Sequence, residues 1–398
     1  MARKSWQRLA ALSVALAVSA PLSLKAQPVA ADVPFTLIDN RVFVPATLNG
    51  QGPFRLLLDT GADTGGISLR TMQAIGAPVE GHARAGGAGE HSDWVVKTHV
   101  ATLQIGRATF RNLPMTAQSF GALNDVIGFR RFDGIAGEAV FRRYVVDIDF
   151  ATARLRLIEP NAFHAPPGAI AVPFTFYQGF MPLVRGSVAG VRGRFVVDLG
   201  DRSSLTLFGP FWRARHLDAT LTPGIAALTG YGVGGPIRGV VVRVPLFAFG
   251  PAKARGIVAR LSLQTSGAFA DPHIAGSVGT GVLKHFRTFI DYPHNRLWLL
   301  PGAQVADRYD RGGLWLGRHG ALFEVFDVIP GGPADVAGLR VGDVVTAIDR
   351  RKSETLDLFA IREKLRDPTF DEPILFDYVR RGRAGQATLR PRDLLPGG

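Results

Sequence analysis

The chain of 398 residues contains no cysteine, which removes several classes of protein from consideration. Without thiols there are no disulfides, no cysteine nucleophile and no cysteine-ligated metal site. Long apolar runs are also lacking, because the longest, at residues 9–20, is well short of the roughly twenty residues that span a bilayer. Neither HExxH nor GxSxG occurs, and AGGAGEH lacks the Lys-Ser/Thr of a phosphate-binding loop. Zincin, α/β-hydrolase and P-loop chemistry are therefore excluded.

The N-terminal sequence MARKSWQRLAALSVALAVSAPLSLKAQ is typical of a secretory signal peptide. Basic residues precede the apolar run, and Leu24-Lys25-Ala26 is an acceptable cleavage site. We predict a signal peptide over residues 1–26 and a periplasmic or secreted location in a bacterial envelope. An uncleaved N-terminal anchor is the alternative. Contact with a membrane is expected only through this transient segment.

The formal net charge is +13. Such a charge attracts anionic surfaces and acidic partners. However, no dense Lys/Arg block with interleaved aromatic residues is present, so we expect no nucleic-acid partner. A solvated basic surface is the simpler interpretation.

A long internal repeat is the most informative feature of the sequence. An apolar run leads directly into Asp-x-Gly at two places, in FRLLLDTGADTGGISL (54–69) and in GRFVVDLGDRSSLTLF (193–208). When Asp59 is laid on Asp198, residues 133–158 fall on residues 275–300 with only a three-residue offset. Short alternating strands and many turns fill both halves. The sequence predicts two pseudo-symmetric, mainly β lobes at 32–159 and 169–301, joined by a Pro-rich linker at 160–168.

A lone carboxylate at the end of a buried strand is costly unless it is hydrogen-bonded. Two carboxylates brought together by a pseudo-twofold axis cannot both ionise, so they share one proton. One is then a base and the other an acid at the same pH, which suits peptide hydrolysis by an activated water. Gly61 and Gly200 allow the backbone to turn close to each carboxylate.

The motif Leu58-Asp59-Thr60-Gly61-Ala62-Asp63, followed by Ile135-Ala136-Gly137, resembles the retropepsin-like aspartic proteases over residues 33–301. The doubled arrangement is similar to a pepsin-like bilobal chain with one catalytic aspartate in each lobe. The resemblance implies that Asp59 and Asp198 are catalytic and that no cofactor or metal is needed. It implies supporting roles for Thr60, Gly61, Ala62, Leu199, Gly200 and Asp201. It also implies two flaps at residues 83–91 and 229–236, with Gly86, Gly87, Tyr231 and Gly232 in them.

The second motif departs from the family pattern at two positions. Leu199 replaces the threonine whose hydroxyl bonds across to the partner lobe, and Asp201 replaces a small residue. Asp201 either shifts the protonation of the pair or is neutralised by Arg202. Two alternatives to an aspartic endopeptidase stay open: a catalytically impaired peptide-binding adaptor, and a zymogen whose segment around Ala31–Pro45 must move.

The segment GGPADVAGLRVGDVVTAIDRR (331–351) resembles a bacterial PDZ domain, which we place at residues 308–395 as an α+β unit. The resemblance implies that the loop containing Gly313, Leu314, Trp315 and Leu316 binds the C-terminal carboxylate of a peptide. The peptide then adds a strand beside a helix around 356–366. Leu356, Phe359, Ala360, Ile361 and Leu365 give that helix one apolar face. The alternative is that this groove is filled by the chain's own segments or by the protease lobes.

The histidines His82, His91 and His99 have no supporting carboxylate spacing, so we interpret them as surface or flap residues. The expected partners are protein or peptide substrates, together with a C-terminal peptide at the PDZ domain.

Overall fold

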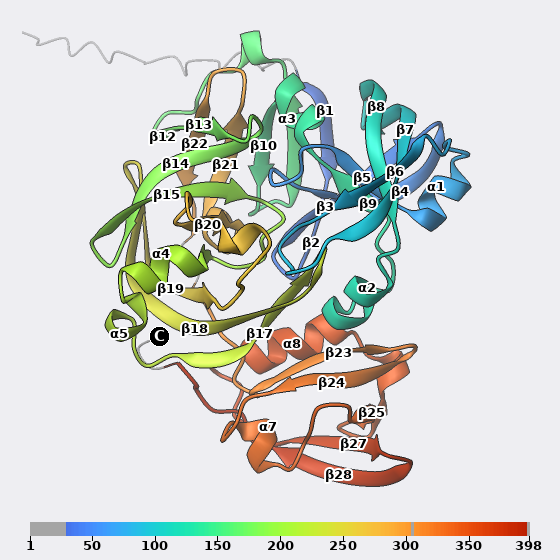
Figure 1. Cartoon of the computed structure of the whole chain (residues 1–398), viewed down its shortest axis with the longest axis vertical. Helices are drawn as coiled ribbons and strands as arrows, with labels where there is room; N and C mark the ends of the chain where they lie inside the picture. The colour runs from blue at the N-terminus through green and yellow to red at the C-terminus, as the bar shows by residue number, and fades with distance from the viewer. Residues whose placement is uncertain (1–28, 304–305, 396–398) are drawn as a thin grey trace, which may run out of the picture.

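The computed structural model describes residues 29–303 and 306–395, and Figure 1 shows two β-rich lobes above a smaller C-terminal unit. The predicted signal peptide lies outside the described residues. None of the helices in the described ranges has the length and apolar character needed to cross a membrane.

Lobe 1 (residues 29–159) is built on an eight-stranded sheet. In sheet order its strands are β2 (Thr36–Ile38), β3 (Arg41–Leu48), β4 (Gln51–Leu58), β9 (Gly134–Ala136), β5 (Gly65–Ser68), β8 (Ala108–Gln118), β7 (Asp93–Ile105) and β6 (Gly81–Ala85). Its helices are α1 (Leu69–Ala74), α2 (Gly121–Ile127) and α3 (Glu138–Arg143).

Lobe 2 (residues 169–301) repeats this sheet element for element. Its strands, in the same order, are β13 (Thr175–Tyr177), β14 (Met181–Val188), β15 (Val191–Asp198), β20 (Gly276–Gly279), β16 (Leu205–Leu207), β19 (Ala252–Ser262), β18 (Gly235–Phe249) and β17 (Ile225–Gly232). Its helices are α4 (Gly209–Ala214), α5 (Leu217–Thr220) and α6 (Thr280–Leu283), and short 3₁₀ turns lie at Pro160–Ala162 and Ala268–Ala270. The predicted mainly β fold with two pseudo-symmetric lobes is confirmed.

A six-stranded sheet joins the lobes. Its order is β1 (Val29–Pro34), β11 (Arg154–Ile158), β10 (Val145–Asp149), β21 (Phe286–Asp291), β22 (Arg296–Pro301) and β12 (Ile170–Pro173). The lobes meet where β10 pairs antiparallel with β21, and Phe141 of lobe 1 stacks on Tyr292 of lobe 2 with 5.4 Å between ring centroids. One hydrophobic core runs through both lobes, which fixes their relative position.

The region Ala31–Pro45, which the zymogen interpretation requires to move, is built into both kinds of sheet. Residues 31–34 belong to β1, which pairs with β11, while β3 lies between β2 and β4. Moving residues 31–45 away would break backbone hydrogen bonds in two sheets, so the structure does not support a detachable segment there.

The C-terminal unit has its own sheet and its own hydrophobic core. Its strands are β23 (Leu314–His319), β24 (Leu322–Val328), β25 (Val344–Ile348), β26 (Arg351–Lys352), β27 (Ile374–Arg380) and β28 (Arg383–Leu389). Its helices are α7 (Pro333–Val336), a 3₁₀ turn at Ser353–Thr355 and α8 (Leu358–Arg366). In Figure 1, α8 lies on the side of this sheet that faces the lobes, close to α2.

The predicted apolar face of α8 is partly wrong. Ala360 is exposed, whereas the charged Arg362 is buried together with Leu358 and Leu365. These three residues are spaced at i, i+4 and i+7 and therefore share one helix face. That face is buried because α8 is covered by the lobes as well as by its own sheet.

Candidate active site

Asp59 and Asp198 occupy equivalent places in the two lobes. Asp59 directly follows the buried end of β4, and Asp198 is the last residue of β15. Each of these strands runs parallel to a short strand that ends in an apolar-Gly sequence, β9 or β20. The Asp59 amide donates to the carbonyl of Ala136 over 3.0 Å. The repeat in the sequence is thus a repeat in backbone geometry.

The two loops cross so that each glycine faces the carboxylate of the other lobe. A Cβ atom on Gly61 would lie 2.9 Å from Asp198 Oδ1, and one on Gly200 would lie 2.6 Å from Asp59 Oδ2. Each glycine amide also donates to its own lobe's aspartate, over 2.7 Å at Asp59 and 2.8 Å at Asp198. Only glycine allows this approach, since any side chain would occupy the space of a carboxylate oxygen.

The two carboxyl groups lie close to each other, since a Cβ atom on Gly61 would lie 2.9 Å from Asp198 Oδ1 and 3.1 Å from Asp59 Oδ1. Two buried carboxyl groups placed in this way do not both ionise, so the pair shares one proton. Burial raises the pKa of Asp59. The pKa of Asp198 lies well above its ordinary value because of burial and then because of the charges of Asp59 and Asp201. The pair therefore retains one proton at pH values where an isolated aspartate is ionised.

Asp201 is neutralised, but not by the residue that the sequence suggests. Arg260 of β19 donates to Asp201 Oδ1 over 2.9 Å, and both side chains are buried. Burial alone would raise the pKa of Asp201, but the Arg260 guanidinium and the hydroxyls of Ser277 and Thr206 outweigh that effect and lower it. Arg202, the predicted partner, instead donates to Asp39 of lobe 1.

Thr60 and Leu199 show how the missing threonine is accommodated. The buried Thr60 hydroxyl donates to the Val197 carbonyl over 2.7 Å and accepts from the Leu199 amide over 3.0 Å. On the opposite side Leu199 packs its side chain into the shared core, while the Thr280 hydroxyl donates to its carbonyl. The lobes are therefore tied by one threonine instead of two.

Ala62 and the apolar-Gly sequences support the loops from behind. The amide of Glu138 donates to the Ala62 carbonyl over 3.1 Å. A Cβ atom on Gly137 would lie 2.7 Å from that carbonyl oxygen, and one on Gly279 would lie 2.5 Å from the Asp201 carbonyl oxygen. Glycine is needed at both positions for this close backbone contact.

Two hairpin tips meet above the carboxylates. The Gly89 amide donates to the Val233 carbonyl over 2.9 Å, and the His91 amide donates to the Gly234 carbonyl over 3.0 Å. A loop of lobe 2 adds a third contact, in which the Ala268 amide donates to the Gly87 carbonyl over 2.9 Å. The β6–β7 and β17–β18 hairpins are therefore closed on each other.

Beneath these hairpins lies a cavity of about 160 Å³ that contains both aspartates. Of the predicted flap residues, Gly87, Tyr231 and Gly232 line it and Gly86 does not. Its walls are mainly apolar, with Leu57, Phe120, Leu123, Phe129, Phe132 and Ile135 from lobe 1 and Ile237 and Phe269 from lobe 2. An apolar, roofed cavity excludes water from the carboxyl pair except where a substrate or a catalytic water is held.

The geometry matches what comparison with protein families finds. A family model for aspartyl proteases matches residues 44–128, and a PDZ domain model matches residues 324–375. The chain carries an aspartyl protease domain followed by a PDZ domain. The protease match runs from β3 to just beyond α2, so it includes Asp59 and stops short of Asp198. A search of curated proteins finds no match.

In the PDZ domain, each of the four predicted peptide-binding residues already forms a hydrogen bond with another residue of the chain. The Gly313 and Leu314 amides donate to Asp310 Oδ1, over 2.7 and 3.4 Å. Burial raises the pKa of Asp310 to about 6. The indole of Trp315 donates to the Val126 carbonyl over 2.6 Å, and the Leu316 carbonyl accepts from Arg362 over 3.0 Å.

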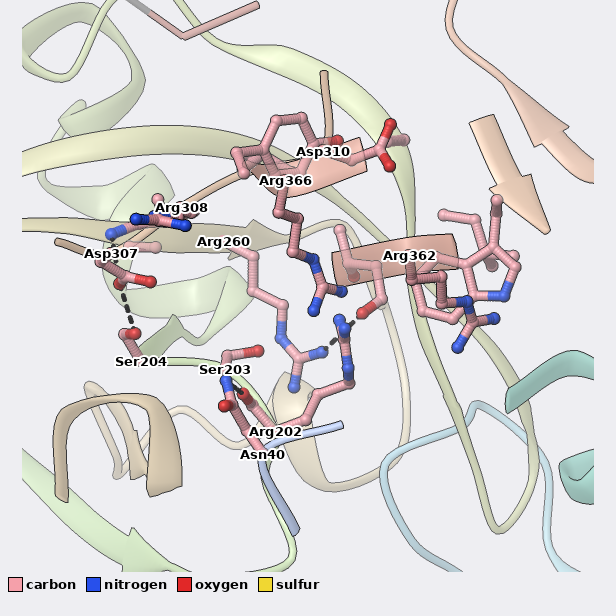
Figure 2. A pocket seen from close by; sticks show the side chains of 18 of the residues that line it. Asn40, Arg202, Ser203, Ser204, Arg260, Asp307, Arg308, Asp310, Arg362 and Arg366 are labelled. Carbon is pink, nitrogen blue, oxygen red and sulfur yellow. Dashed lines mark hydrogen bonds between the residues drawn. The ribbon is translucent and has the colours of Figure 1, made fainter. Parts of the chain in front are cut away.

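A second cavity, of about 300 Å³, lies between lobe 2 and the PDZ domain (Figure 2). Arg202, Arg260, Arg308, Arg362 and Arg366 line it together with acidic residues such as Asp307 and Asp310. Arg260 borders both this cavity and the one that holds the aspartates. The Asp201–Arg260 pair therefore separates the carboxyl pair from the domain interface.

Sequence reasoning missed Arg260 and the aromatic wall. Phe120, Phe129 and Phe132 lie shortly before Ile135-Ala136-Gly137, so their spacing offered a signal for the wall. Arg260 offered none, because its partner is 59 residues away. Across residues 29–303 and 306–395, no group of three or more His, Asp or Glu side chains is arranged to hold a metal ion.

Proposed function

We propose that this protein is an aspartic endopeptidase that hydrolyses protein or peptide substrates with Asp59 and Asp198. The observation that carries the proposal is the close pair of buried carboxyl groups, one from each lobe, inside an apolar cavity roofed by two hairpins. Such a pair holds an acid and a base at one pH. The aspartyl protease family match supports the same reaction class.

In the proposed reaction, the ionised carboxylate takes a proton from a water molecule held between the two groups. The water oxygen attacks the peptide carbonyl carbon while the protonated carboxyl donates its proton to the carbonyl oxygen. Collapse of the tetrahedral intermediate breaks the C–N bond, and a proton passes to the leaving amine. The pair returns to its singly protonated state without a cofactor.

The walls of the cavity suggest which substrates fit. Phenylalanine rings from lobe 1 line the same cavity as the aspartates, together with Ile237 and Phe269 of lobe 2. Burial of apolar side chains against these walls favours peptides with large apolar residues beside the bond that is cleaved. The hairpin tips must separate to admit a chain and close again over it.

A periplasmic or secreted location remains part of the proposal. It is supported by the N-terminal sequence, in which basic residues precede an apolar run and an acceptable cleavage site.

Capture of a peptide by the PDZ domain would add a second substrate contact. A C-terminal peptide that adds a strand to β23 competes with α2 of lobe 1, because Trp315 and Arg362 already hold α2 there. Capture and this contact therefore exclude each other.

The rival function is a peptide-binding adaptor that no longer catalyses. Leu199 favours it, because one of the two threonines that would brace the pair is absent. The adaptor binds peptides through the same cavity but releases them uncut.

The test is cleavage of a denatured protein between about pH 4 and pH 7 by the wild type and by Asp59→Asn. We expect the wild type to cut, a transition-state mimic of aspartic proteases to inhibit it, and Asp59→Asn to be inactive yet folded by circular dichroism. Equal cleavage by the variant would refute the assignment. Binding without cleavage by the wild type would favour the adaptor.

A further inference from the structure

The PDZ domain contacts lobe 1 through the surface on which such a domain binds peptides. We call this surface the β23–α8 face, formed by Leu314–His319 and Leu358–Arg366. β23 is the edge strand of its sheet, and α2 of lobe 1 packs directly against it. A Cβ atom on Gly128, at the end of α2, would lie 2.3 Å from Leu358 Cδ2. The end of α2 therefore touches both the strand and the helix of this face.

Three side chains of the PDZ domain bind the last carbonyl groups of α2. Arg362 donates to Ile127 over 2.6 Å and to Val126 over 3.2 Å, and Arg318 donates to Gly128 over 2.9 Å. The Trp315 indole also donates to Val126. The last carbonyls of a helix have no partner within the helix, so these donors satisfy groups that would otherwise need water.

Arg362 also bridges the two partners. Its Nε donates to the Leu316 carbonyl on β23, and its guanidinium lies 4.9 Å from the Trp315 ring centroid. Burial lowers the pKa of Arg362 to about 9. Its hydrogen bonds within the described residues go to carbonyl oxygens and to no carboxylate. A buried cation with such partners is costly in folding, which points to a role beyond stability.

The segment held in this way forms one wall of the active-site cavity. Phe120 precedes α2, Leu123 lies within it, and Phe129 follows it. Phe129 packs on Phe359 of α8 with ring centroids 5.7 Å apart. A single apolar cluster includes Phe120, Phe129 and Phe132 and packs against Tyr231 of the lobe 2 flap and Trp315 of the PDZ domain.

The PDZ domain also contacts the flap hairpin of lobe 2. Asp327 of β24 accepts the Leu228 amide of β17 over 2.6 Å and pairs with Arg238 of β18 over 3.0 Å. The PDZ domain thus binds two parts of the active-site region: the cavity wall around α2 in lobe 1 and the flap hairpin of lobe 2.

We propose that the β23–α8 face has lobe 1 of the same chain as its ligand, and that Arg362 is a positioning residue for the substrate-binding wall around α2. The positioning role rests on the proposed protease function, whereas the occupancy of the face by α2 does not. The aromatic wall is then aligned by a domain whose residues do not line the active-site cavity.

The test compares full-length Arg362→Met, Arg362→Lys and Arg380→Met with the wild type. Arg380 is a matched control because its guanidinium binds Asp343 and the Gly338 carbonyl, both inside the PDZ domain. Hydrogen exchange of residues 121–128 reports the contact, and KM and kcat for a peptide with large apolar residues report the positioning.

For Arg362→Met we expect exchange in residues 121–128 and KM each to rise about tenfold, with kcat within about twofold, because uniform substrate binding is lost. Lysine should recover part of both changes, and Arg380→Met should change neither. Loss of folded enzyme would instead lower apparent kcat at constant KM. Unchanged exchange in Arg362→Met would overturn the assigned ligand, and unchanged KM would overturn the positioning role. If the wild type cuts no peptide, the protease function falls, and exchange alone decides whether the PDZ domain holds α2.

Discussion

The guanidinium of Arg260 donates to the carboxylate of Asp201 over 2.9 Å, with Asp201 three residues beyond Asp198. A third carboxylate beside an aspartate pair would be expected to disturb its shared proton. Arg260 limits that disturbance, yet the charge of Asp201 still contributes to the raised pKa of Asp198. The protonation of the pair therefore depends on a buried ion pair that lies between two cavities.

Asp201→Asn should shift the pH profile of cleavage. The variant removes a negative charge near Asp198 and leaves the cation of Arg260 without its carboxylate. Both changes favour ionised Asp198 and lower its pKa, so the shared proton is lost at a lower pH. The alkaline limb of kcat/KM against pH should move to lower pH, while Asp218→Asn, an exposed change of equal charge in lobe 2, leaves it in place. An alkaline limb that keeps its position or moves to higher pH in Asp201→Asn would contradict this account.

Asp198→Asn should stabilise the fold at neutral pH. Because burial raises the pKa of Asp198 in the folded chain, the folded state binds its proton more tightly than the unfolded state, where the value is about 3.9. Stability is lost as pH rises from the unfolded value through the folded one, and asparagine avoids that loss. We expect a higher Tm at pH 7, by about 2–4 °C per kcal/mol, and little change at pH 3. A lower Tm at pH 7 would show that the ionised form is well accommodated.

Thr60→Val should weaken the junction between the lobes. It removes the hydroxyl that serves both the Val197 carbonyl and the Leu199 amide, groups that are buried with it. Two unsatisfied backbone groups predict a loss of about 2–4 kcal/mol in the free energy of unfolding. Urea unfolding of Thr60→Val and Thr60→Ser measures this, with serine as the control that keeps the hydroxyl. Similar midpoints for the two variants would mean that the bond contributes little.

The features of the fold that depend on the internal sequence repeat were predicted correctly. Laying Asp59 on Asp198 anticipated the duplicated sheets, because alternating strands and glycine turns are local signals. The choice of Arg202 as the partner of Asp201 failed for a physical reason. Adjacent residues on a turn point in different directions, so Arg202 reaches Asp39 while Asp201 faces inward to Arg260.

Contacts between the domains could not be read from the sequence. The pattern of α8 favoured an apolar face that included Ala360, whereas the buried member is Arg362. Its partners in lobe 1 are backbone carbonyls more than 200 residues away, and backbone groups carry no sequence signature. The use of the β23–α8 face by α2 follows only from the packing of whole domains.

Closure of the hairpin tips should depend on Gly89 and not on Gly86. A Cβ atom on Gly89 would lie 2.1 Å from the Gly234 carbonyl carbon, whereas one on Gly86 would meet nothing within 4 Å. Gly89→Ala therefore forces the tips apart, and an open roof binds and shields the substrate less well. We expect kcat/KM to fall about tenfold for Gly89→Ala and to stay within about twofold for Gly86→Ala. Both changes restrict the unfolded chain equally, so a difference in Tm between them reports the tip contact itself. Equal activity of the two variants would mean that the roof can close without the Gly89–Val233 hydrogen bond.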